Sequence, residues 1–81
     1  MQDIRERLHE ARLHADVGAL TEAERLVRAA LALADAAPPE SCSPIVRGYI
    51  VVAELAISKG NSRLATSALD RALEETAGEG E

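Results

Sequence analysis

The second half of this 81-residue chain repeats the first half after a shift of 42 residues. Apolar positions follow the shift, since Leu8 falls on Ile50 and Val27 falls on Leu69. Small residues follow the shift as well: the turn glycine Gly18 falls on Gly60, Ala11 falls on Ala53, and Ala23 falls on Ala65. Such a repeat predicts two copies of one supersecondary unit, packed so that each buries the apolar face of the other.

Each copy is predicted to be two helices joined by a tight glycine turn. In the first copy Ile4, Leu8, Ala11 and Ala15 recur at helical spacing, and Gly18 suits the left-handed conformation that ends a helix. Two N-terminal caps are expected here. One is Asp3, and the other is a capping box running from Thr21 to Glu24.

The second copy is predicted to begin at Ser43, a favourable N-cap followed by Pro44 at the first helical position. An almost unbroken apolar run from Ile45 to Ile57 follows, and the last helix is expected to end near Thr76. The predicted domain covers 1–77, with hairpin one at 3–36, a proline-rich linker at 37–43 and hairpin two at 44–77. Residues 78–81 are expected to form a disordered tail.

The apolar residues are mostly small, which favours an all-α fold. The chain has 16 Ala and 10 Leu but only one Tyr, no Phe and no Trp. Alanine is the best helix former and allows helices to approach closely, whereas a β-sandwich draws on β-branched and aromatic residues. Short turns make consecutive helices antiparallel, so the expected fold is two antiparallel helix hairpins with four helices.

Charge, length and the lone cysteine exclude several classes of function. The net charge of −5 argues against nucleic acid as a partner, and no apolar run reaches the length of a membrane span. No signal segment precedes the first helix, and Cys42 has no second cysteine to pair with, so a cytoplasmic location is expected. His9 and His14 lie about 140° apart on a helix and so do not share a metal. No cofactor and no enzymatic activity are predicted.

Hairpin two resembles a tetratricopeptide (TPR) repeat between Tyr49 and Thr76. The resemblance rests on these residues: Tyr49 at the large aromatic position, Val52-Ala53 in place of Leu-Gly, Gly60 at the turn, Ala65 at the small position, Leu69, and Ala72-Leu73. Hairpin one departs from the pattern because Arg7 stands at the aromatic position, and the linker is about eight residues longer than the 34-residue period allows. Two arrangements therefore stay open, a TPR-like right-handed stack and a four-helix bundle.

The TPR resemblance implies that the first helix of each hairpin lines a concave binding face. By position, the partner-binding residues are then Arg5, Leu8, Arg12, Arg47, Ile50, Glu54 and Ile57. An apolar strip of Leu8, Ile50 and Ile57 with arginines beside it suits an amphipathic partner helix with acidic edges. Tyr49, Val52, Ala53 and Ala56 are expected in the core, while Ile45 and Leu55 are expected to meet neighbouring hairpins. The alternative is that helix three is the most buried helix of a compact bundle.

The sequence thus predicts a non-catalytic protein–protein interaction module, an adaptor or small chaperone-like subunit that binds a partner helix or peptide. Small TPR-like chaperones of bacterial secretion systems are similar in size and acidity. Two alternatives remain: a self-associating homodimer that buries helix three against its copy, and a two-repeat fragment of a larger TPR regulator. Two hairpins make a thin core, which favours a second chain in either case.

Overall fold

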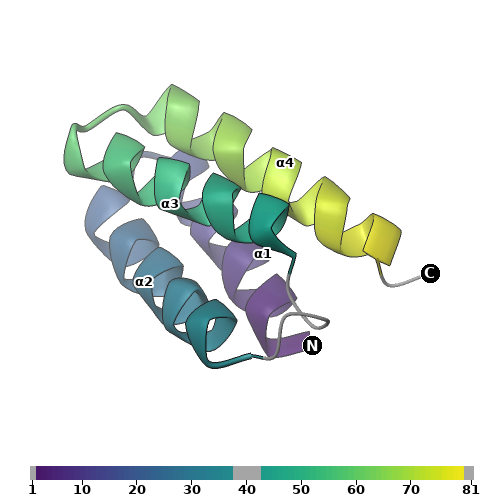
Figure 1. Ribbon diagram of the computed structural model, residues 1–81. Helices are drawn as coiled ribbons and strands as arrows, with labels where there is room; N and C mark the ends of the chain where they lie inside the picture. The colour runs from purple at the N-terminus through teal and green to yellow at the C-terminus, as the bar shows by residue number, and fades with distance from the viewer. Residues whose placement is uncertain (1, 38–42, 80–81) are drawn as a thin grey trace.

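The computed structural model describes residues 2–37 and 43–79 and consists of four helices (Figure 1). Their bounds are α1 Gln2–Asp16, α2 Leu20–Ala36, α3 Pro44–Ser58 and α4 Ser62–Glu79. No strand occurs within the described residues, so the predicted all-α class is confirmed. Predictions about Pro38, Pro39 and Cys42 in the linker, and about residues 80–81, fall outside the described residues.

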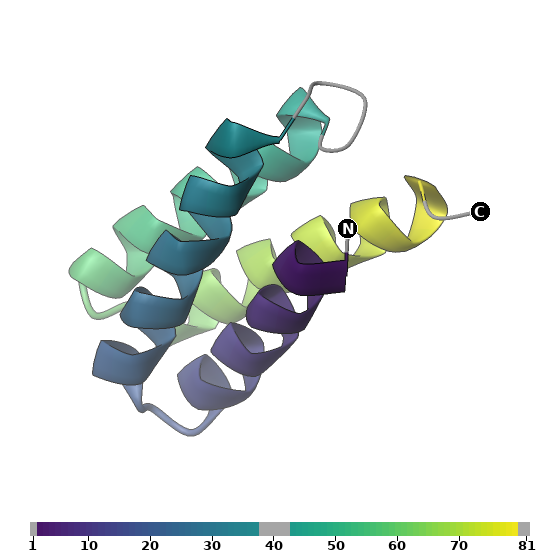
Figure 2. The same cartoon turned by 90° about the horizontal axis from the view of Figure 1, so that it is seen from below.

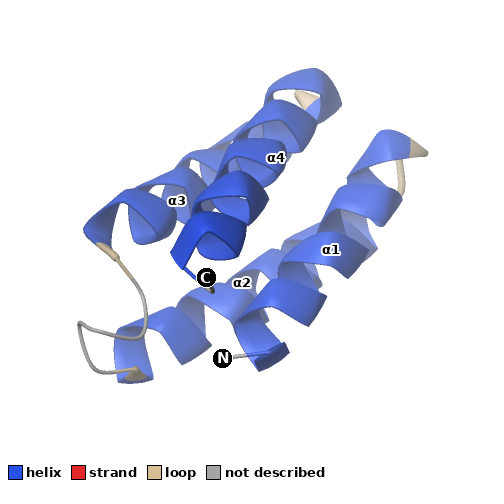
Figure 3. Ribbon diagram, turned by 90° about the vertical axis from the view of Figure 1, so that its right-hand side faces the viewer, coloured by secondary structure: helices blue, strands red, loops and turns tan. Residues whose placement is uncertain are grey.

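The helices form a closed ring rather than an open stack. Helix α1 packs against α2 and α4, and α3 packs against α4 and α2, so α1 and α3 occupy opposite corners (Figure 2). Figure 3 shows α4 lying between α3 and α1. Of the two arrangements left open by the sequence, the structure has the four-helix bundle. The first helices of the two hairpins therefore do not line a shared concave face.

Both tight turns have the predicted glycine geometry. Gly18 has a φ of +84° and Gly60 a φ of +74°, in the left-handed region that favours glycine. The Ala19 N–H donates to His14 O at 2.8 Å, and the Asn61 N–H donates to Ala56 O at the same distance. These bonds satisfy carbonyl groups that the ends of α1 and α3 would otherwise leave without partners.

Of the three predicted helix starts, only that of α3 is correct. Ser43 caps α3, since its Oγ accepts the Val46 N–H at 3.2 Å, and Pro44 is the first helical residue. Helix α1 instead begins at Gln2, which places Asp3 inside the helix, and α2 begins at Leu20, with Ala19 as a cap residue that makes no side-chain bond. The expected Thr21 capping box is thus wrong. Helix α4 runs past Thr76 to Glu79, so Gly78 and Glu79 are helical rather than part of a tail.

Most core positions follow the internal repeat. Among the residues whose burial the structure describes, ten of the seventeen buried apolar ones are alanines, and the largest fully buried side chains are Leu8, Ile50, Leu69, Val27 and Val46. Pairs related by the shift of 42, such as Leu8 with Ile50 and Val27 with Leu69, are buried alike. Exposure also follows the repeat, since Leu13 and its equivalent Leu55 are each 57% exposed. The two hairpins therefore contribute equivalent faces to one core.

Truncating a core leucine tests this burial. We expect Leu8→Ala to lower the free energy of unfolding by about 2–5 kcal/mol, because the side chain is fully buried and its removal leaves a cavity. The matched control is Leu13→Ala on the same helix, which should change it by less than about 0.5 kcal/mol. Urea titration followed by circular dichroism measures both. Equal losses for the two variants would contradict the assignment of the α1 faces.

Candidate functional site

The apolar residues assigned to a partner groove lie in the interior of the bundle. Leu8 and Ile50 are 0% exposed and Ile57 is 5% exposed, because the faces of α1 and α3 that carry them point toward the other helices. They form part of the core rather than a surface strip. The expectation of an apolar binding strip at these positions is therefore corrected in favour of the buried-helix alternative.

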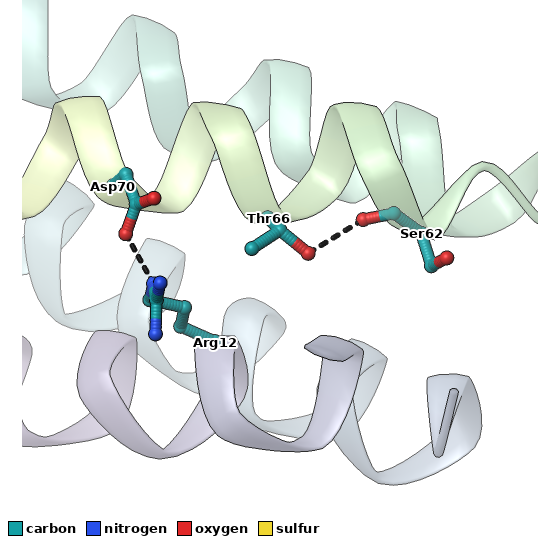
Figure 4. A network of polar contacts seen from close by, with 4 residues as sticks. All are labelled: Arg12, Ser62, Thr66 and Asp70. Atoms are coloured by element: carbon teal, nitrogen blue, oxygen red, sulfur yellow. Dashed lines mark hydrogen bonds and ion pairs between the residues drawn. The ribbon is translucent and has the colours of Figure 1, made fainter. Parts of the chain in front are cut away.

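Three of the four charged residues in that predicted set join the hairpins to each other. The Arg12 guanidinium pairs with the Asp70 carboxylate across α1 and α4 (Figure 4). Between α2 and α3, Glu54 accepts a bond from Arg28 at 3.0 Å. Arg47 of α3 pairs with Asp35 of α2 at 2.5 Å. These side chains thus lie along the two seams of the ring, while Arg5 is exposed on α1.

Helix α3 carries an exposed apolar stripe on the side away from the core. Ile45 and Leu55 are each 57% exposed and Val52 is 41% exposed, which corrects the expectations that Val52 lies in the core and that Ile45 and Leu55 meet another hairpin. With the exposed Gly48 they follow one another at intervals of three, four and three residues. That spacing puts them on one helix face, in the a/d pattern of a coiled-coil seam. We call Ile45, Gly48, Val52 and Leu55 the α3 stripe.

The equivalent face of α1 is acidic. A shift of 42 residues relates the α3 stripe, in order, to Asp3, Glu6, Glu10 and Leu13. Glu6 and Glu10 are exposed, as charged side chains on the outer face of a helix ordinarily are. The bundle fold therefore tolerates carboxylates at these positions, and the apolar residues of the α3 stripe are not needed to build the monomer. The sequence already contains this signal, because aligning the polar positions of the two hairpins shows carboxylates on one helix opposite apolar residues on the other.

Gly48 has no structural purpose within the monomer. It lies inside α3 rather than at a turn, its φ is not positive, and an added Cβ would meet nothing within 4 Å. A glycine inside a helix costs about 1 kcal/mol relative to alanine. A gap at this position lets another backbone or side chain approach the middle of the α3 stripe closely.

Hairpin two carries opposite charges at its two ends. Lys59 and Arg63 flank the turn between α3 and α4, and neither forms an ion pair with a described residue. Glu74 and Glu75 lie exposed near the other end of α4. None of the four residues of the α3 stripe is charged, and the two charged residues between Ile45 and Leu55, Arg47 and Glu54, pair with side chains of α2. The turn end of hairpin two is thus cationic, whereas near the other end of α4 the two carboxylates outnumber the one exposed cation, Arg71.

One further polar feature lies on the outside of the bundle. A shallow depression between the end of α1 and the start of α4 is lined by Ala15, Asp16, Ser62, Arg63, Thr66, Ser67 and Asp70. There the Thr66 hydroxyl donates to the Ser62 carbonyl at 2.7 Å (Figure 4).

Within the described ranges no cluster of three His, Cys, Asp or Glu residues is placed to hold a metal ion. None of the described helices is long and apolar enough to cross a membrane.

Comparison with known proteins finds no match among family models, curated proteins or solved structures. The TPR resemblance therefore stays a prediction. The candidate site rests on the geometry of the α3 stripe and on the difference between the two hairpins.

The two kinds of glycine should respond oppositely to alanine. We expect Gly48→Ala to raise the free energy of unfolding by up to about 1 kcal/mol, because the position is helical and open. Gly60→Ala should lower it by about 1–2 kcal/mol, because its left-handed φ is strained for an L-residue. Thermal and urea unfolding measure both at a protein concentration of a few micromolar. A loss of monomer stability with Gly48→Ala would show that the glycine serves the fold.

A double-mutant cycle tests the seam between α2 and α3. Arg28→Ala and Glu54→Ala should show a coupling of about 0.2–1 kcal/mol, because the pair is partly exposed to solvent. Raising the salt concentration should reduce this coupling. The cycle is measured by urea unfolding at two ionic strengths. A coupling energy near zero at both would show that this ion pair does not help to hold the hairpins together.

Proposed function

We propose that this protein is a non-catalytic protein-interaction module that docks a helix of another polypeptide on the α3 stripe. The observation that carries the proposal is the contrast between equivalent faces, which are apolar on α3 and acidic on α1. Four of the six large apolar residues found exposed in the described part of the chain belong to hairpin two, namely Ile45, Val52, Leu55 and Leu64.

The chemistry of the stripe favours a helical partner. Its three-four-three spacing matches the seam along which two helices pack with knobs into holes. Burying three aliphatic side chains removes apolar area from water at about 25 cal/mol per Å², the largest favourable term in most associations. Gly48 lets the partner helix come near at the middle of that seam. The interaction role predicted from the sequence is thus kept, but it moves from the inner face of α3 to its outer face.

The site is tested by giving α3 the residue that α1 already has. Val52→Glu copies Glu10, its equivalent in the repeat, and leaves the buried face of α3 unchanged. We expect a tagged Val52→Glu variant to lose proteins that the wild-type chain captures from an extract of its own cells, copies of the chain itself included. Quantitative mass spectrometry compares the two sets.

Leu13→Glu is the matched control, because Leu13 is also exposed but lies on the acidic face of α1. It should retain what the wild type captures. Circular dichroism must show equal helicity for all three proteins. Identical capture by wild type and Val52→Glu would refute docking on the α3 stripe.

A further inference from the structure

We propose that the polypeptide docked on the α3 stripe is a second copy of this chain, with the two α3 helices antiparallel about a two-fold axis that passes close to residue 50. This inference rests on the proposed function, since it names the occupant of the same stripe. A two-fold interface uses one patch twice and must therefore be complementary to itself. The α3 stripe meets that requirement in shape, in polarity and in the charges at its ends.

The shape of the stripe matches its own antiparallel copy. When the residue numbers of facing positions add to 100, Ile45 lies opposite Leu55 of the second copy and Gly48 lies opposite Val52 of the second copy. Each of these contacts then occurs twice. Large aliphatic side chains meet at the two outer positions, and near the axis the space left by Gly48 receives the Val52 side chain. Gly48, which nothing in the monomer explains, thereby has a packing role.

The charges at the two ends of hairpin two select the antiparallel direction. In that arrangement the end bearing Lys59 and Arg63 lies beside the end of the second copy that bears Glu74 and Glu75. A parallel arrangement would instead place like charges together at both ends, which is unfavourable. The middle of the stripe has no charge, so two copies approach without repulsion where the contact is closest.

A second copy also fits the stripe better than a partner with charged edges. An amphipathic helix with acidic edges needs cations available along its length, but Lys59 and Arg63, which make no ion pair with a described residue, stand at one end of the hairpin. The nearest arginine within α3, Arg47, already pairs with Asp35 of α2. When two copies of such a seam run in opposite directions, the uncharged middles face each other and each cationic end faces an acidic end.

Sedimentation equilibrium tests the dimer on the full chain. We expect the wild type to dimerise and Val52→Glu to weaken the dimer by at least about tenfold, because two carboxylates would be buried at the interface. Gly48→Gln should weaken it to a similar extent while raising the thermal midpoint of the monomer, since glutamine is the better helix former. If Gly48 served only the fold of the monomer, this substitution would not weaken the dimer while stabilising the monomer. Leu13→Glu should dimerise as the wild type does.

Cysteine crosslinking tests the register. In a Cys42→Ser background, mixing Ile45→Cys with Leu55→Cys should form a disulfide-linked dimer. Each variant alone should form none, because its two cysteines would be separated by ten residues, about 15 Å along the helix axis. A disulfide requires Cα atoms within about 7 Å of each other. Linkage within either variant alone, at the rate of the mixture, would overturn the antiparallel register.

Failure of this inference can be told apart from failure of the proposed function. A wild-type chain that stays monomeric to millimolar concentration overturns the second copy. If Val52→Glu nevertheless loses a captured protein that Leu13→Glu keeps, docking on the α3 stripe stands with a different occupant. A dimer that persists unchanged in Val52→Glu also overturns the second copy on the α3 stripe, because the copies then associate through another surface. Docking on the stripe is refuted as well only if capture by Val52→Glu equals capture by the wild type.

Discussion

The close approach of alanine-lined helices determines most other properties of this bundle. Ten of the seventeen apolar residues that are buried in the described part of the chain are alanines, so few large side chains fill the space between the helices. Close packing of this kind requires complementary surfaces and makes each large core residue important for stability. The ion pairs along the seams are partly exposed and contribute less.

The internal repeat separates what the fold needs from what it does not. Buried positions agree between the hairpins, as Leu8 with Ile50 and Val27 with Leu69 show. The outer face of α3 is one place where the hairpins diverge, with Val52 in place of Glu10. Because the equivalent face of α1 carries exposed carboxylates, the fold itself does not require apolar residues on the outer face of α3. The proposed function and the proposed two-fold pairing both depend on this divergence.

Much of the local structure could be predicted from particular residues. Gly18 and Gly60 end their helices in the left-handed conformation, and Ser43 with Pro44 starts α3, because these residue types have strong backbone preferences. The predicted caps at Asp3 and Thr21 were wrong. A capping side chain contributes only about 1 kcal/mol, which other contacts can outweigh: α2 begins at Leu20, one residue before Thr21, and Leu20 packs against the core.

By itself, the sequence determined the helices, the tight turns and the pairing of helices into two equivalent hairpins, because these depend on local preferences and on a helical repeat of small residues. Only the tertiary structure decided which face of α3 is buried and that the ring closes through α1 and α4. The physical reason is that α3 is apolar on more than one face, so its hydrophobic pattern does not define a single direction for the core. Packing against α2 and α4 buried Ile50 and Ile57 and left Ile45, Val52 and Leu55 on the outside.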